Sequence, residues 1–199
     1  MKNLFYPFLI LVVLTISAFS FAQEEGEMGG MDQQAMMEAW QKSMTPGPMH
    51  ELLARQVGEW KGNVSMWMDP SQPPTTTEGT TVCKSILGGR YFTSTHTSTM
   101  MGMPFEGIEL NGYDNVNEEF FNTWIDNFGT GIMYLKGSYD EASKTFTYNG
   151  TMTDPMTGTD MNVKEVVNIV DNDNTKFEMY IVQGEQEFKT MEINYTRVK

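Results

Sequence analysis

The pattern of apolar and polar positions changes once along the chain, at residue 58. From there to the end, apolar residues recur at every second position in short segments, which is typical of strands with one buried face. Gly, Asn, Asp and Pro residues separate consecutive segments and indicate turns. The pattern predicts about ten strands, over residues 58–69, 75–87, 90–99, 104–112, 119–126, 132–138, 144–152, 163–170, 176–182 and 187–198.

The short turns decide how these strands pair. Strands joined by a short turn become antiparallel neighbours, and no helix-length segment interrupts the series. A sheet of this size twists, and it then either closes on itself or splits into two sheets. Closure removes both exposed edges. The sequence therefore predicts an all-β fold, an antiparallel up-and-down β-barrel, in preference to a sandwich.

Two short segments before residue 58 have helical periodicity instead. Residues 32–42 carry apolar side chains on one side, and Asp32 is a suitable N-cap. Residues 50–57 do so as well, and Gly58 is a typical C-terminal signal. We therefore expect a short N-terminal helical segment ahead of the barrel.

The first residues have the order of a secretory signal peptide. Lys2 precedes an uncharged apolar run that ends in small residues up to Ala22. An uncleaved anchor is the alternative, which the barely sufficient length of the run disfavours. We expect removal of residues 1–22, export to the periplasm or the medium, and no stable membrane insertion afterwards. Residues 23–47 would form a Met-, Gly- and Glu-rich tail, and residues 48–199 the barrel domain.

Charge and cysteine content narrow the partners. The net charge of −13 repels nucleic acid and anionic lipid head groups, so we expect neither as a partner. The single Cys83 excludes an internal disulfide, and its place in a strand predicts a buried, inert thiol. The oligomeric state stays open.

The sequence does not point to a reaction. Its most distinctive stretch, residues 100–132, contains no nucleophile–base pair, no phosphate loop and no clear metal-ligand spacing. Of the two histidines, His50 starts a helix and His96 lies in a strand, where a structural role is the simpler interpretation. Carboxylates such as Glu106, Asp126 and Glu165 are scattered singly. We therefore expect no catalytic residues, and binding is favoured over catalysis.

A barrel of this size has room for one small molecule. If Trp60 points inward, strand alternation gives an apolar and aromatic interior that suits an apolar or amphipathic ligand. In the alternative, the side chains fill the barrel, and its role is structural or lies in protein interaction. The predicted cavity residues are Met66, Phe92, His96, Trp124, Tyr134, Tyr148, Phe177 and Met191, and the other residues predicted to face inward are Val64, Met68, Phe146, Val167, Met179 and Ile193.

The 18 methionines raise another possibility. Thioethers are soft ligands that suit Cu(I), and Met100, Met101 and Met103 cluster at a turn. Methionine is also a flexible core filler, which explains many of the others. Periplasmic handling of Cu(I) or another metal is therefore the alternative function.

Two features resemble the calycin barrels, which include the lipocalins and the fatty-acid-binding-like proteins. Gly58-Glu59-Trp60 follows a short helix, as at the opening of those barrels. In lipocalins an Arg late in the barrel lies over this Trp and closes one end through a cation–π contact. The resemblance implies that Trp60 and Arg197 close the barrel here.

A longer resemblance covers nearly the whole mature chain. The bacterial family known only as domain of unknown function 1579, which is grouped with the calycins, is similar in seven segments: PGPMHELLARQVGEWKG, SILGGRY, MMGMPFEGIELNGYDN, TWIDNFGTGI, DPMTG, FEMY and FKTMEINYTR. The resemblance implies a barrel but brings no established activity and no catalytic residue. Some calycin-like barrels bind haem through a C-terminal His, which residues 176–199 lack, so no cofactor is expected.

Overall fold

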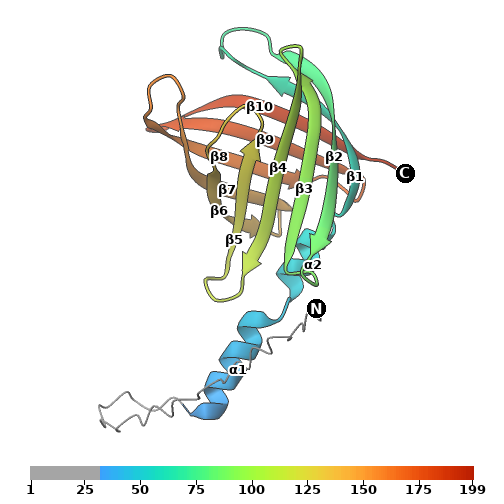
Figure 1. Cartoon of the computed structure of the whole chain (residues 1–199), viewed down its shortest axis with the longest axis vertical. Helices are drawn as coiled ribbons and strands as arrows, with labels where there is room; N and C mark the ends of the chain where they lie inside the picture. Colours follow the sequence, from blue (N-terminus) through green and yellow to red (C-terminus); the bar gives the residue numbers. More distant parts are fainter. Residues whose placement is uncertain (1–31) are drawn as a thin grey trace, which may run out of the picture.

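Ten antiparallel strands close into a barrel in the computed structural model, which describes residues 32–199 (Figure 1). Two helices precede the strands. The elements are α1 (Gln33–Met44), α2 (Pro48–Ala54), β1 (Gly58–Met66), β2 (Thr75–Ile86), β3 (Tyr91–Met100), β4 (Met103–Asp114), β5 (Glu119–Asp126), β6 (Met133–Asp140), β7 (Thr145–Thr153), β8 (Asp160–Ile169), β9 (Asn174–Gln183) and β10 (Gln186–Arg197).

Each strand pairs with its neighbours in the sequence, and β1 pairs with β10 to close the ring. The predicted up-and-down barrel is confirmed, with every strand close to its predicted position. Within residues 32–199, no helix has the length and apolarity needed to cross a membrane. The predicted signal peptide, residues 1–22, lies outside the described residues, as does the first part of the predicted tail.

The barrel has two different ends. Helix α2 lies against one of them, which we call the helix end (Figure 1). There Leu52 and Leu53 of α2 are buried in a core with inward side chains of the strands, among them Phe92, Phe120 and Phe146. The connections β1–β2, β3–β4, β5–β6, β7–β8 and β9–β10 lie at the opposite, loop end. The apolar core thus fills the helix end of the barrel.

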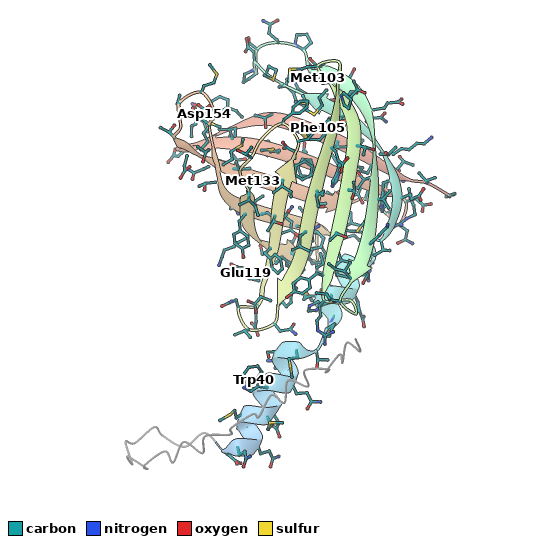
Figure 2. The ribbon with its side chains drawn as sticks, viewed as in Figure 1. Trp40, Met103, Phe105, Glu119, Met133 and Asp154 are labelled. Carbon is teal, nitrogen blue, oxygen red and sulfur yellow. The ribbon has the colours of Figure 1, made fainter. Side chains whose placement is uncertain are left out.

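Helix α1 begins where the sequence predicts, because the Asp32 carboxylate accepts a hydrogen bond from the backbone N–H of Gln34 (3.2 Å). Its apolar side chains are exposed, and Trp40 lies away from the barrel (Figure 2). Only its C-terminal end is attached to the barrel. The Asn115 amide, from the β4–β5 turn, donates to the carbonyl of Thr45 (2.7 Å), and Arg90 donates to the carbonyl of Met44 (2.8 Å).

Helix α2 ends at Ala54, three residues before its predicted end. The following carbonyls bind side chains of the closed barrel instead of continuing the helix. Arg197 donates to the carbonyl oxygens of Arg55 (2.6 Å) and Val57 (2.7 Å), and the Trp60 indole donates to that of Gln56 (2.9 Å). The sequence pattern shows helical periodicity but not these tertiary hydrogen bonds.

Trp60 and Arg197 are cross-strand partners at the helix end of the β1–β10 pairing. The guanidinium lies 4.1 Å from the centre of the indole ring and also donates to the carbonyl of Asn172 (3.0 Å). Gly58 makes room for this arrangement: its φ is +138°, and a Cβ there would lie 2.6 Å from a guanidinium nitrogen. A planar cation with several donors is therefore needed at this position.

Replacing Arg197 with Lys should lower the free energy of unfolding by about 1–3 kcal/mol, because an ammonium cannot donate to three separate carbonyls while stacked on an indole. Urea unfolding followed by tryptophan fluorescence measures this change. Arg55→Lys is the matched control, since the Arg55 side chain is exposed. An unchanged unfolding midpoint for Arg197→Lys would show that the contact does not hold the helix end closed.

Candidate ligand cavity

The barrel contains a cavity of about 960 Å³, lined by residues from all ten strands. At the helix end it reaches Gln56 and Trp60, and at the loop end it reaches Met100, Pro155 and the β5–β6 loop. The interior is therefore filled beneath α2 and hollow beyond it. The volume is in the range of sites for small molecules.

The wall of the cavity is apolar for most of its length. Thioether side chains are a main part of it, and flexible side chains of this kind adapt to ligands of different shape. Part of the high methionine content of the sequence is thus accounted for by the cavity wall. The methionines that line the cavity are Met66, Met100, Met133, Met152, Met179 and Met191, and other apolar wall residues are Val64, Phe105, Phe128, Ile132, Val167, Phe177 and Ile193.

Most of the residues predicted to line a cavity do so. They come from six different strands, β1, β3, β5, β7, β9 and β10, and are Met66, His96, Trp124, Tyr148, Phe177 and Met191. Phe92 also points inward, but it is fully buried in the core at the helix end and does not reach the cavity.

Two inward predictions are wrong. Tyr134 is 49% exposed and stacks on Phe121 on the outer face, with ring centres 6.3 Å apart. In β6 the inward positions are those of Met133 and Leu135. Because β6 has apolar residues on both faces, the sequence pattern does not show which face points inward. Met68 is 83% exposed, because β1 ends at Met66 and the chain turns away.

Trp124 forms an aromatic wall on one side of the cavity. Its ring lies over Gly107, where a Cβ would come within 2.3 Å, and its centre is 5.1 Å from that of His96. Its indole N–H donates to the Asp126 carboxylate (2.8 Å), which also accepts the backbone N–H groups of Phe128 and Gly129. Asp126 therefore links the wall to the β5–β6 loop.

A cluster of polar side chains on the inner face of the strands forms what we call the polar floor: His96, Glu109, Asn111, Asn122 and Glu165. The Asn122 amide nitrogen donates to Glu109 Oε1 (2.8 Å) and to Glu165 Oε2 (3.2 Å). Asn111, the cross-strand partner of Asn122, is two residues from Glu109 on the same inward face of β4. Two carboxyl groups thus share one amide inside the barrel.

The two carboxyl groups have different proton affinities. Burial raises the pKa of Glu165 to about 8, and the charge of Glu109 adds to this effect. Burial also opposes ionisation of Glu109, but its polar neighbours His96, Asn111 and Ser94 lower its pKa overall. At neutral pH the pair therefore carries one negative charge, on Glu109, and one proton, on Glu165.

Hydrogen bonds orient His96 at the edge of the floor. Its Nδ1 lies 2.9 Å from the Thr81 hydroxyl and 3.4 Å from the Tyr195 hydroxyl. Its Nε2 is 3.6 Å from Glu109 Oε2, beyond a direct hydrogen bond. His96 thus connects the other residues of the polar floor with the aromatic wall.

The predicted site residues do not include Glu109, Asn111 or Asn122, and Glu165 is predicted as an isolated carboxylate. A signal is present in β4, where two successive inward positions, Glu109 and Asn111, are polar and the outward ones, Ile108 and Leu110, are apolar. This is the reverse of the usual pattern for a strand with a buried face. Glu165 of β8 comes close to Glu109 of β4 only when the barrel is closed, so the sequence pattern does not show that the two carboxyl groups are neighbours.

The proposed methionine metal site is only partly assembled. Met100 lines the cavity, and Met103 is its cross-strand partner at the rim of the loop end (Figure 2). Met101 lies in the turn and is 76% exposed. Over residues 32–199, no three His, Cys, Asp or Glu side chains are placed to hold a metal ion.

The free energy of unfolding should fall as the pH rises from about 5 to about 8. The folded protein keeps the Glu165 proton up to its raised pKa of about 8, whereas the unfolded chain releases it near 4.5. The loss should approach about 1.4 kcal/mol per pH unit. In urea unfolding at pH 5.5 and 7.5, Glu165→Gln should show a smaller loss, and the exposed control Glu185→Gln should behave as the wild type. Equal losses in all three would contradict a buried, protonated Glu165.

Comparisons with known proteins agree with the fold. A family model described as "Protein of unknown function (DUF1579)" matches residues 45–197, from the α1–α2 link to the end of β10. No curated protein matches. A structure titled "Crystal Structure of Rv2717c from M. tuberculosis" is similar with 14% identity and a TM-score of 0.58, over 78% of this chain and 100% of that chain, which shows a shared fold. Because the family model spans α2 and all ten strands, this chain belongs to the DUF1579 family.

Proposed function

We propose that the protein binds one small amphipathic molecule inside the barrel and does not transform it. The observation that carries this proposal is the cavity of about 960 Å³ with an apolar wall and a polar floor. Pockets that hold small molecules have volumes of roughly 300–1,000 Å³ and combine apolar lining with a few polar groups. The volume also counts against the alternative of a filled barrel with a purely structural role.

The distribution of polarity supports one orientation of the ligand. The methionine and aromatic side chains extend to the loop end, whereas Glu109, Asn111, Asn122 and Glu165 lie in the interior. A ligand with an apolar tail and a polar head would place its head against the floor and its tail toward the loops. Apolar burial would supply most of the affinity, and the floor would supply selectivity.

Narrowing the cavity should remove binding. Met66 and Met152 lie on opposite sides of the ring near the loop end, so the double replacement Met66→Trp and Met152→Trp reduces the space between them. A neutral, environment-sensitive dye such as Nile red should bind the wild type, and the double variant should bind it at least about tenfold more weakly.

Ser65→Trp and Thr151→Trp form the matched control, because each is the neighbour of a replaced methionine and points outward. The control should bind the dye as the wild type does. Equal loss in both double variants, with both folded by circular dichroism, would place the dye on the outer surface. Absence of dye binding to the wild type would contradict the proposal.

Export is part of the same proposal, and it rests on the composition of residues 1–22. Intact-mass measurement of the protein from its native host should give a chain that starts at Gln23. Cell fractionation should find it outside the cytoplasm. A full-length chain beginning at Met1 in the cytoplasm would contradict export.

A further inference from the structure

We infer that the ligand's head is a protonated amine that donates N–H hydrogen bonds to the polar floor. This inference rests on the proposed function and specifies the ligand class. It follows from which atoms of the floor lack a partner and from the sign of the charges that line the cavity.

Two amide oxygens on the floor have no hydrogen-bond partner. Asn111 is 3% exposed and Asn122 is 4% exposed, and the Oδ1 atom of each is unpartnered. The orientation of Asn122 is fixed because its nitrogen already donates to Glu109 and Glu165. Asn111 is two residues from Glu109 on the same inward face of β4, and its Oδ1 is unpartnered as well. Asn122 therefore turns its nitrogen to the carboxyl pair, and each of the two amides leaves an acceptor without a donor.

The two asparagines lie side by side. Asn111 on β4 and Asn122 on β5 are cross-strand partners, and both line the cavity. A buried acceptor without a donor costs free energy comparable to a lost hydrogen bond. Two N–H donors from a ligand, one for each oxygen, would recover this free energy at both sites. The polar floor therefore favours a head group with at least two hydrogen-bond donors.

The charge of the lining selects the sign of the head. Among the described residues that line the cavity there are three acidic side chains, Asp126, Glu109 and Glu165, and no Lys or Arg. His96 is the basic side chain of the floor, and its Nε2, the third unpartnered atom there, lies 3.6 Å from Glu109 Oε2. A carboxylate head would face the Glu109 charge and two amide oxygens, which are all acceptors. An ammonium head would satisfy all three.

The titratable groups facing Glu165 predict a second signature of amine binding. They are Glu109 on β4, His96 on β3, Tyr148 on β7 and Tyr195 on β10, and the two tyrosines stay neutral because burial raises the pKa of each. A cation placed among these groups favours ionisation of Glu165. Binding of an ammonium head near pH 7 should therefore release up to about one proton.

A panel of ligands with the same chain tests the inference on the wild-type protein. Dodecylammonium carries charge and N–H donors, dodecyltrimethylammonium carries charge alone, dodecanol has one neutral donor, and dodecanoate is anionic. By displacement of Nile red at pH 7.5, dodecylammonium should bind roughly 10- to 100-fold more tightly than dodecanoate and at least about 10-fold more tightly than the trimethyl form.

Equal affinity of the ammonium and trimethyl forms would overturn donor recognition by the floor. Tighter binding of dodecanoate or dodecanol would overturn the amine assignment, while the proposed function would stand. Failure of the wild type to bind the dye and every ligand would instead contradict the proposed function itself. The two levels of the proposal thus fail in different ways.

Replacement of Glu109 tests whether its charge causes the preference for the ammonium head. Glu109→Gln should weaken dodecylammonium binding roughly 10- to 100-fold while leaving dodecanol nearly unchanged. Glu106→Gln is the matched control, because Glu106 lies on the same strand with its side chain exposed. Equal weakening of both ligands by Glu109→Gln would mean that the variant disturbs the cavity as a whole, and the charge assignment would then be rejected.

A calorimetric measurement gives a readout that does not depend on that variant. Titration of dodecylammonium in buffers of different ionisation enthalpy at pH 7 should show proton release from the wild type. In Glu165→Gln the release should disappear while binding remains. Release unchanged in Glu165→Gln, or no release from the wild type, would contradict a head placed beside the carboxyl pair.

Discussion

The pairing of β1 with β10 is the contact on which the rest of the molecule depends. Its register runs from Trp60 opposite Arg197 at the helix end to Met66 opposite Met191 toward the loop end. The first pair becomes the stacked contact that ties the barrel to the chain after α2. The last pair forms part of the cavity wall. One seam therefore both closes the sheet and completes the cavity.

A closed barrel could still be filled by its own side chains. Glycines on the inner wall help to keep this barrel hollow. Gly62 and Gly137 are cross-strand partners of Tyr195 and Tyr148, and a Cβ at these glycines would come within 3.1 Å and 2.4 Å of the partner's ring. Gly107 lies under Trp124 in the same way. Aromatic side chains that lie flat on the wall occupy less of the lumen than side chains that point to the axis. The sequence thus covers its inner wall and keeps a cavity, whose lost packing contacts lower stability.

Much of the fold was predictable because the physical signals for it are local. Alternation of apolar and polar positions and turn residues determine the strands, and short turns impose their order. The sequence pattern does not determine which face of β6 points into the barrel, since Met133 and Tyr134 are both apolar enough to face inward. The end of α2 depends on Arg197, far away in the sequence. The polar floor depends on Glu109 and Glu165 meeting across the lumen, which no local pattern reports.

The separation of charge across the wall bears on why the floor exists. On the outer face of β8, β9 and β10, the ammonium groups of Lys164, Lys176 and Lys189 pair with glutamates. The described lining of the cavity contains no Lys or Arg, and the carboxyl pair on the inner face is held by the Asn122 amide instead. Buried carboxyl groups of this kind reduce stability, and an apolar floor of equal volume would not. Stability therefore does not account for the inner pair, whereas the proposed recognition of a donor-bearing cation would.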